Sequence, residues 1–254
     1  MAVPMIICGH PRSGTTMLTR LCNTHPEARV TFEFRSFRRL DVPAAEHLQA
    51  IRTDWRERRI LAKRHARWGG GLFLQRYRWA IRRSGEQPIS AGVVSDVLSD
   101  LFPHAKVVGD KFPDYVFDLD QLCEIEGLRR LVIVRDPRDV ARSAMQMSQT
   151  SWKGQDFTDE MDTPEKVAAR WVRSIETIER NRDRIFALRY EHFVADPSAA
   201  LDQIGEWLGI DPAGFERQRV HGASAGRYRD GLSPDEIDRI LRVAGPTMER
   251  LGYA

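Results

Sequence analysis

The stretch GHPRSGTTML at residues 9–18 constrains this chain more than any other part of its sequence. Gly9 and Gly14 keep the G-x-x-x-x-G spacing of a phosphate-binding loop, in which backbone N–H groups and the N-terminus of the following helix surround an anion. The apolar run at residues 5–8 precedes the loop, and helix-compatible residues follow it. The stretch therefore predicts a strand, a phosphate-binding loop and a helix.

The loop lacks the lysine that nucleoside triphosphatases place directly after its second glycine. Thr15 and Thr16 follow Gly14 instead, and a threonine cannot reach the β- and γ-phosphates as that lysine does. Positive charge is supplied by Arg12, whose planar guanidinium suits a pair of phosphate or sulfate oxygens. We expect Arg12, Ser13 and the three residues after them to bind a phosphate-containing ligand that need not carry a metal-bound triphosphate.

The segment RDPRDVARS predicts a second anion site. Arg135 follows the buried apolar run at residues 131–134, where a strand is expected to end and a helix to begin. Ser143 lies eight residues after Arg135, which is about two helical turns. The two side chains can therefore clamp an anion that lies across the helix. Further candidates on the same helix are Arg138 and Arg142.

Strands that alternate with helices set the expected fold class. The expected strands are residues 5–8, 30–34, 106–108, 131–134 and 185–189. Helix starts are indicated by Ser90, Asp136, Thr163 and the capping box Ser233-x-x-Glu236, and Pro246 is expected to break the last helix. This order predicts a three-layer α/β/α sandwich with a central, mostly parallel sheet, as in P-loop nucleoside triphosphatases, with ligands at the carboxyl ends of the strands.

The composition is that of a soluble globular protein. The 254 residues are 42% hydrophobic and 30% charged, with a mean hydropathy of -0.45, and we expect a single domain over residues 1–254. No apolar run approaches the ~20 residues of a membrane span, and no signal peptide is recognised, so a cytoplasmic location is expected. Cys8, Cys22 and Cys123 lack zinc-ligand spacing. We interpret them as reduced structural thiols and expect no metal.

The net charge of +3 conceals one basic block. Residues 52–83 hold eleven Lys or Arg against two acids, within a segment at about 40–88 that reads as a helical insertion. Its aromatic residues are Trp55, Trp68, Phe73, Tyr77 and Trp79. Two interpretations stay open: amphipathic helices with aromatic rings packed inward, or a lid on the acceptor side. No nucleic-acid-binding motif accompanies the charge, so nucleic acid is not an expected partner.

Together these stretches resemble the sulfotransferases that use 3′-phosphoadenylyl sulfate (PAPS). PRSGTT is similar to that family's 5′-phosphosulfate loop, and RDPRDVARS is similar to its 3′-phosphate site. The run RSGTTMLTRLCNTHPEARVTFEFR resembles the tyrosylprotein sulfotransferase branch, and LRYEHFVADP and SAGRYRDGLSPDEIDRI resemble later segments of the family. The similar segments are residues 5–35, 106–145, 186–197 and 222–252. The basic block lies outside them.

The resemblance implies three catalytic residues. Glu33 corresponds to the catalytic base of the tyrosylprotein branch, although an ion pair with Arg35 is an alternative. Lys111, in GDKFP, would bear on the bridging or transferring oxygens, and Arg12 would stabilise charge on the leaving oxygen. His10 is an alternative base, because other branches use histidine.

The resemblance also implies the nucleotide contacts. Arg135 and Ser143 would bind the 3′-phosphate, and Tyr190 would contact adenine, unless it serves as an apolar contact beneath the following helix. Ser224 and Arg227 lie in a loop that would close over the nucleotide. The alternative for that segment is an ordinary surface loop.

The resulting expectation is a sulfotransferase that moves the sulfuryl group of PAPS to a hydroxyl, with an amine as the second choice, and releases PAP. The acceptor would be a small molecule, natural product or carbohydrate. Arginine outnumbers lysine 34 to 5, which fits a bacterial source with GC-rich DNA. The first alternative is a P-loop kinase that uses ATP and Mg²⁺, and the second is a protein that binds PAP or PAPS without turnover.

Overall fold

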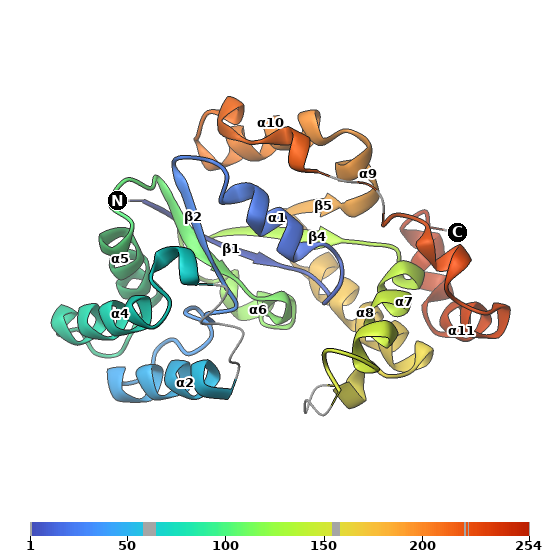
Figure 1. Ribbon diagram of the computed structural model, residues 1–254, viewed down its shortest axis with the longest axis horizontal. Helices are drawn as coiled ribbons and strands as arrows, with labels where there is room; N and C mark the ends of the chain where they lie inside the picture. Colours follow the sequence, from blue (N-terminus) through green and yellow to red (C-terminus); the bar gives the residue numbers. More distant parts are fainter. Residues whose placement is uncertain (1, 58–64, 154–157, 221, 223, 254) are drawn as a thin grey trace.

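A computed structural model describes residues 2–57, 65–153, 158–220, 222 and 224–253. Within these residues, parallel strands form one central sheet in the order β2-β3-β1-β4-β5 (Figure 1). The strands are β1 (Val3–Cys8), β2 (Ala28–Phe32), β3 (Val107–Lys111), β4 (Arg129–Val134) and β5 (Phe186–Arg189). The sheet is entirely parallel, so its strand carboxyl ends share one edge.

Helices cover both faces of this sheet, as Figure 1 shows. One face carries α1 (Thr15–Cys22), α9 (Tyr190–Ala195) and α10 (Pro197–Leu208). The other carries α2 (Ala44–Glu57), α4 (Gly71–Ser84), α5 (Ala91–Leu101), α6 (Leu119–Leu122), α7 (Pro137–Ser148), α8 (Pro164–Arg180) and α11 (Pro234–Arg250). Met5 and Ile7 of β1 join the core under α1, whereas Ile6 and Cys8 join the opposite core, as alternation along a strand requires. The predicted three-layer sandwich is confirmed.

Short 3₁₀ helices occupy several connections. They are η1 (Ala66–Trp68), η2 (Pro113–Phe117), η3 (Thr158–Glu160), η4 (Arg182–Arg184), η5 (Pro212–Gly214), η6 (Arg217–Arg219) and η7 (Arg227–Asp230). Among the described residues, no helix combines the length and the apolarity needed to cross a bilayer. All three cysteines are buried and free, as predicted.

The predicted helix starts are confirmed, but one predicted end is wrong. The Ser90 side chain caps α5, and Ser233 and Glu236 form the capping box of α11. Pro246 does not break α11, which continues to Arg250. The helix packs against α8 through its buried face, while Pro246 lies on the exposed face. The backbone carbonyl that loses its helical partner there can therefore be solvated, and packing holds the helix together.

The carboxyl ends of two strands also differ from prediction. The second strand ends at Phe32 rather than at residue 34, and the third extends to Lys111. Phe32 pairs with Lys111 in the parallel register, and the chain then leaves the sheet because Glu33 adopts a φ of 56°. Glu33 therefore follows a strand, and Lys111 ends one.

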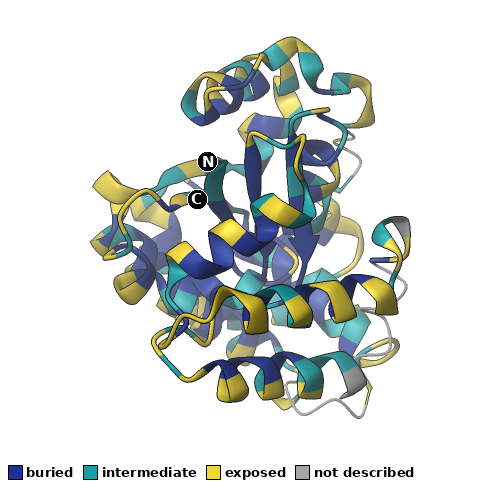
Figure 2. Cartoon of the chain, turned by 90° about the vertical axis from the view of Figure 1, so that its left-hand side faces the viewer, coloured by how far each residue is buried: buried dark blue, intermediate teal, exposed yellow. Residues whose placement is uncertain are grey.

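The basic insertion forms α2, η1 and α4 beside the sheet edge at β2. Figure 2 looks onto this side and shows helices with a buried and an exposed face. Phe73 and Tyr77 are buried, with ring centroids 5.2 and 4.8 Å from that of Phe34. Trp79 is 60% exposed. The interpretation that the aromatic rings pack inward is therefore correct for Phe73 and Tyr77 but not for Trp79. Residues 58–64, which carry four of the eleven basic residues, lie outside the described ones.

Candidate active site

The loop between β1 and α1 has the backbone that the sequence predicts. Gly9 has a φ of 144°, and a Cβ there would lie 2.2 Å from the Ile133 carbonyl oxygen. Gly14 has a φ of 103°, and a Cβ there would lie 2.8 Å from Cδ2 of Tyr190. Both positions require glycine, because a side chain would be strained and would collide with its neighbours. The loop is thus packed tightly onto β4 and α9.

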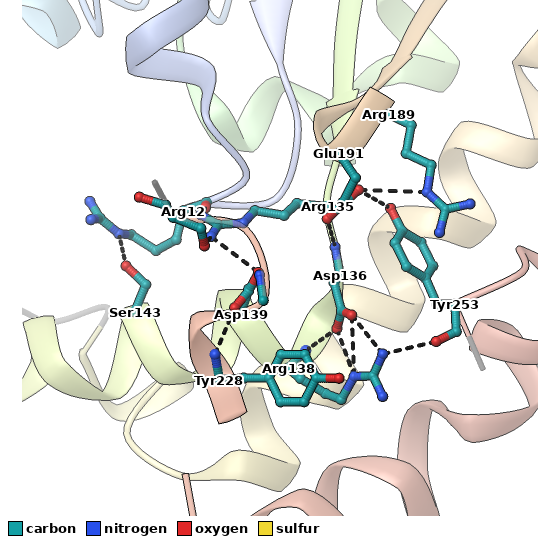
Figure 3. Close-up of polar contacts among 12 residues, drawn as sticks. Arg12, Arg135, Asp136, Arg138, Asp139, Ser143, Arg189, Glu191, Tyr228 and Tyr253 are labelled. Atoms are coloured by element: carbon teal, nitrogen blue, oxygen red, sulfur yellow. Dashed lines mark hydrogen bonds and ion pairs between the residues drawn. The ribbon is translucent and has the colours of Figure 1, made fainter. Parts of the chain in front are cut away.

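Arg12 joins the two predicted anion sites. Its Nε donates to Ser143 Oγ at 2.9 Å, and its own carbonyl oxygen accepts from Arg135 Nη1 at 3.2 Å (Figure 3). Arg12 also has a φ of 76°, an unfavourable region for a residue with a side chain. Segments 120 or more residues apart in sequence therefore present their cations to one region at the strand carboxyl ends.

Arg135 is held on several sides at the end of β4. The residue is 7% exposed, and its Nη2 lies 3.3 Å from Asp139 Oδ2. The same nitrogen donates to the Ser224 carbonyl oxygen. Its guanidinium carbon lies 4.4 Å from the centroid of the Tyr190 ring. Arg135, Tyr190 and Ser224, each a predicted nucleotide contact, therefore lie next to one another.

Asp139 is a site residue that sequence reasoning missed. Its carboxylate is buried and accepts from the backbone N–H groups of Gly226 at 2.7 Å and Tyr228 at 2.9 Å. The contact with Arg135 is an i,i+4 pair, and this spacing was the available signal. Asp139 thus ties the loop at residues 224–228 to α7. Arg227, in the same loop, is exposed.

Glu33, Lys111 and Thr16 form a second cluster near the loop. Lys111 is fully buried, and its Nζ donates to Glu33 Oε1 at 2.8 Å and to Thr16 Oγ1 at 3.3 Å. Arg35 instead pairs with Asp54 of α2 at 2.6 Å, so the alternative ion pair of Glu33 with Arg35 is wrong. The reason is register: Lys111 lies opposite Phe32, beside Glu33, whereas Arg35 comes two residues later and its side chain reaches Asp54 of α2.

Two buried hydrogen-bond donors at the anion sites have no partner within the described residues. They are Ser13 Oγ in the loop and Nε of Arg135. Buried polar atoms in native proteins are nearly always paired, by protein, water or ligand. A donor hydroxyl and a guanidinium N–H therefore remain available to an anionic ligand. Thr15 is buried as well, and its backbone carbonyl accepts a hydrogen bond from the Thr19 hydroxyl.

His10 is buried in a neutral form. Its Nδ1 lies 2.8 Å from the Pro11 carbonyl oxygen, which can only accept, so Nδ1 carries the proton. Nε2 is buried and has no partner among the described residues. Burial, reinforced by the positive charge of Arg170, lowers the pKa of His10 to about 3. These contacts favour a local structural role over that of a base.

The lowered pKa of His10 predicts a pH dependence of stability. The unfolded chain takes up this proton near pH 6.5, whereas the folded one does so only near pH 3, so stability falls as the pH drops through this window. A His10→Gln variant is expected to lose less thermal stability than the wild type between pH 7 and pH 4.5, measured by unfolding midpoints. His104→Gln, at an exposed position, is the control. Equal losses in the wild type and His10→Gln would contradict the prediction.

Trp152 also went unnoticed in the sequence. Its ring centroid lies 5.8 Å from the guanidinium carbon of Arg12. It follows α7, and no spacing in the sequence relates it to the loop. Among the described residues, no group of three or more His, Cys, Asp or Glu side chains is arranged to hold a metal ion.

Comparison with known proteins identifies the family. Residues 4–214 match the Sulfotransferase family. The sulfotransferase domain of the Synechococcus PCC 7002 olefin synthase shares 21% identity and a TM-score of 0.56, over 96% of this chain and 95% of that one. A sulfotransferase from Alicyclobacillus acidocaldarius shares 18% identity with a TM-score of 0.54, over 99% of this chain and 95% of that one. Retinol dehydratase, in complex with androsterone and the inactive cofactor PAP, shares 15% identity with a TM-score of 0.50, over 97% of this chain and 80% of that one.

These findings agree with the site geometry. The family match spans well over half of the chain and includes the loop, Glu33, Lys111 and the Arg135–Ser143 segment. The solved structures share the fold across almost the whole chain. The predicted family is confirmed: the chain belongs to the sulfotransferase family and is an enzyme that transfers a sulfuryl group.

Proposed function

We propose that this enzyme takes the sulfuryl group from PAPS and transfers it to a hydroxyl group of a small molecule, natural product or carbohydrate, releasing PAP. The observation that carries the proposal is the hydrogen bond from Arg12 to Ser143. It joins the loop that would hold the 5′-phosphosulfate to the helix that would hold the 3′-phosphate. One nucleotide with anions at both ends can therefore reach both sites.

The donor would be held by charge at each end. Arg12, Ser13, Gly14, Thr15 and Thr16 would bind the 5′-phosphosulfate, and the Ser13 hydroxyl, which has no partner in the described part of the chain, would be one donor. The 3′-phosphate would be bound by Arg135 and Ser143. A phosphate there would accept from Nε of Arg135, for which the described residues offer no partner, and would compete with Arg12 for Ser143. Retinol dehydratase, which shares the fold, holds PAP.

The adenosine would lie between these two ends. Tyr190 is proposed to contact adenine, and its ring packs beneath Gly14 and beside the Arg135 guanidinium. Ser224 and Arg227 are proposed to cover the nucleotide. The hydrogen bond from Arg135 to the Ser224 carbonyl supports this, because it holds the loop over the same region.

In the proposed transfer, Glu33 removes the proton of the acceptor hydroxyl. The acceptor oxygen forms a bond to sulfur while the bond from sulfur to the bridging oxygen breaks, and the electron pair stays on the 5′-phosphate of PAP. Charge therefore grows on the leaving oxygen, which Arg12 and Lys111 would stabilise. The 2.8 Å contact between Lys111 and Glu33 brings the cation and the base to the same place.

The acceptor would enter beside the insertion. The Arg35–Asp54 pair links α2 to the turn that carries Glu33, and Phe32 N donates to His65 Nε2 at 3.3 Å. These contacts support the interpretation of the insertion as the acceptor-side lid. Trp152, near Arg12, offers an apolar surface for the acceptor. We also propose that the enzyme is bacterial and cytoplasmic.

Calorimetric titration with PAP, ADP and ATP·Mg²⁺ tests the donor. We expect PAP to bind about 10²-fold more tightly than ADP, since a buried charged contact to the 3′-phosphate is worth a few kcal/mol. Binding of ATP·Mg²⁺ that equals or exceeds that of PAP would instead favour the kinase.

Turnover is tested with sulfur-labelled PAPS and a panel of acceptor alcohols, with and without chelator. PAP binding without transfer to any acceptor would favour a binding protein.

A further inference from the structure

The turn that carries Glu33 is held by two consecutive residues of the neighbouring strand. The backbone N–H of Glu33 donates to the Lys111 carbonyl oxygen at 2.6 Å. The next two N–H groups, of Phe34 and Arg35, donate to the two carboxylate oxygens of Asp110 at 3.1 and 2.7 Å. Three successive N–H groups are thus bound by Asp110 and Lys111, and two of them converge on the Asp110 carboxylate.

Asp110 is fully buried and accepts four hydrogen bonds. Besides the two backbone N–H groups, Thr31 Oγ1 donates to Oδ1 at 2.6 Å, and Tyr115 Oη donates to Oδ2 at 2.8 Å. Each carboxylate oxygen therefore accepts twice, which uses the full capacity of an ionised carboxylate. Tyr115 Oη in turn accepts from Phe37 N at 3.1 Å and so reaches further along the turn.

This turn is strained at two of its residues, Glu33 and Arg35. Glu33 has a φ of 56° and Arg35 a φ of 61°, both in the left-handed region that glycine favours. Residues with side chains stay in this region only when their surroundings hold them there, and such positions cluster at functional sites. The bonds from residues 33–35 to Asp110 and Lys111 are those surroundings. They turn the chain sharply after β2 and place the Glu33 carboxylate within hydrogen-bond distance of Lys111 Nζ.

We propose that Asp110 is a positioning residue for sulfuryl transfer, and that Tyr115 assists it. This inference rests on the proposed role of Glu33 as the base. By binding the N–H groups of Phe34 and Arg35, Asp110 fixes the backbone on which Glu33 stands, so that its carboxylate meets the acceptor hydroxyl beside Lys111. Asp110 itself touches neither donor nor acceptor.

An Asp110→Asn variant tests the role, because its amide group turns one acceptor oxygen into a donor that faces other donors. We expect kcat to fall about 10²-fold, the loss typical of a base displaced by about 1 Å. The Kd for PAP should stay at the wild-type value, since the Asp110 carboxylate contacts Thr31, Phe34, Arg35 and Tyr115 and none of the residues proposed to bind the nucleotide. In a Glu33→Gln background, Asp110→Asn should cause no further loss of kcat, because residues that act as a unit are not additive.

Tyr115→Phe is a milder variant that keeps the core volume. We expect about a tenfold loss of kcat, which is the scale of one hydrogen bond to a charged group, and no loss in the Glu33→Gln background. Tyr77→Phe is the matched control: Tyr77 is equally buried and its ring packs on Phe34 of the turn, but its hydroxyl contacts His47 Nε2 at 2.9 Å rather than Asp110. It should cost stability but leave kcat unchanged.

The outcomes separate two failures. If Glu33→Gln turns over at the wild-type rate, the proposed base is wrong, and the positioning role falls with it. If Glu33→Gln is severely impaired but Asp110→Asn and Tyr115→Phe keep wild-type kcat, or lower it equally in both backgrounds, only the positioning role is overturned. Should Asp110→Asn not fold, the same cycle with Tyr115→Phe decides.

Discussion

A Glu33→Gln variant is expected to lose about 10²–10⁴-fold in kcat, which is the usual contribution of a general base. Glutamine keeps the shape of the side chain, and its oxygen can still accept from Lys111 Nζ, but it cannot take a proton from the acceptor. Binding of PAP should stay at the wild-type level, because Glu33 belongs to neither anion site. The measurements are initial rates with labelled PAPS and calorimetric titration with PAP.

Glu165→Gln is the matched control for this prediction. Glu165 lies on α8, and its Oε2 is 2.8 Å from Nη2 of Arg239 on α11. The same substitution there should leave kcat unchanged. A loss of PAP binding in Glu33→Gln that parallels the loss of kcat would contradict the prediction, because it would mean that the variant disturbs the donor site rather than proton removal.

An Arg135→Lys variant is expected to bind PAP about 10²-fold more weakly, the scale found when a buried, hydrogen-bonded charge pair is broken. Lysine keeps one positive charge but has no planar fork, so it cannot grip two phosphate oxygens and Asp139 together. ADP, which lacks the 3′-phosphate, should lose much less affinity. Selectivity for PAP over ADP, measured by calorimetric titration of both, should therefore collapse.

Arg180→Lys serves as the control for Arg135→Lys. Arg180 ends α8, and its Nη2 lies 2.8 Å from Asp120 Oδ2 on an exposed surface. Neither nucleotide should bind differently to this variant. If Arg135→Lys weakened PAP and ADP by the same factor, Arg135 would support the loop rather than recognise the 3′-phosphate.

Local patterns in the sequence predicted the parts of the site that depend on local physics. The loop requires glycine where φ is positive and where β4 and α9 lie against its backbone, and the G-x-x-x-x-G spacing places glycine at both positions. The start of α7 is set by the Asp136 cap and by Pro137 at the first helical position, so the place of Arg135 was readable as well. Adjacent strands then brought Arg12 and Ser143 together.

Other predictions failed because packing overrode local preference. Pro246 lowers helix propensity, yet the buried face of α11 against α8 keeps the helix intact through it. The second strand was expected to continue through Glu33 because its residues alternate, but hydrogen bonds to β3 turn the chain at that point. Neither override leaves a trace in the spacing of residues along the chain.

The sequence by itself determined the order of strands and helices, the phosphate-binding loop and the residues that would carry charge to a nucleotide. These follow from short-range rules of backbone conformation, capping and hydrophobic periodicity. Only the tertiary structure decided the partner of each charge: Glu33 with Lys111, Arg35 with Asp54, and Arg135 with Asp139. The reason is that burial makes an unpaired charge costly, and the available partners depend on strand register and helix packing.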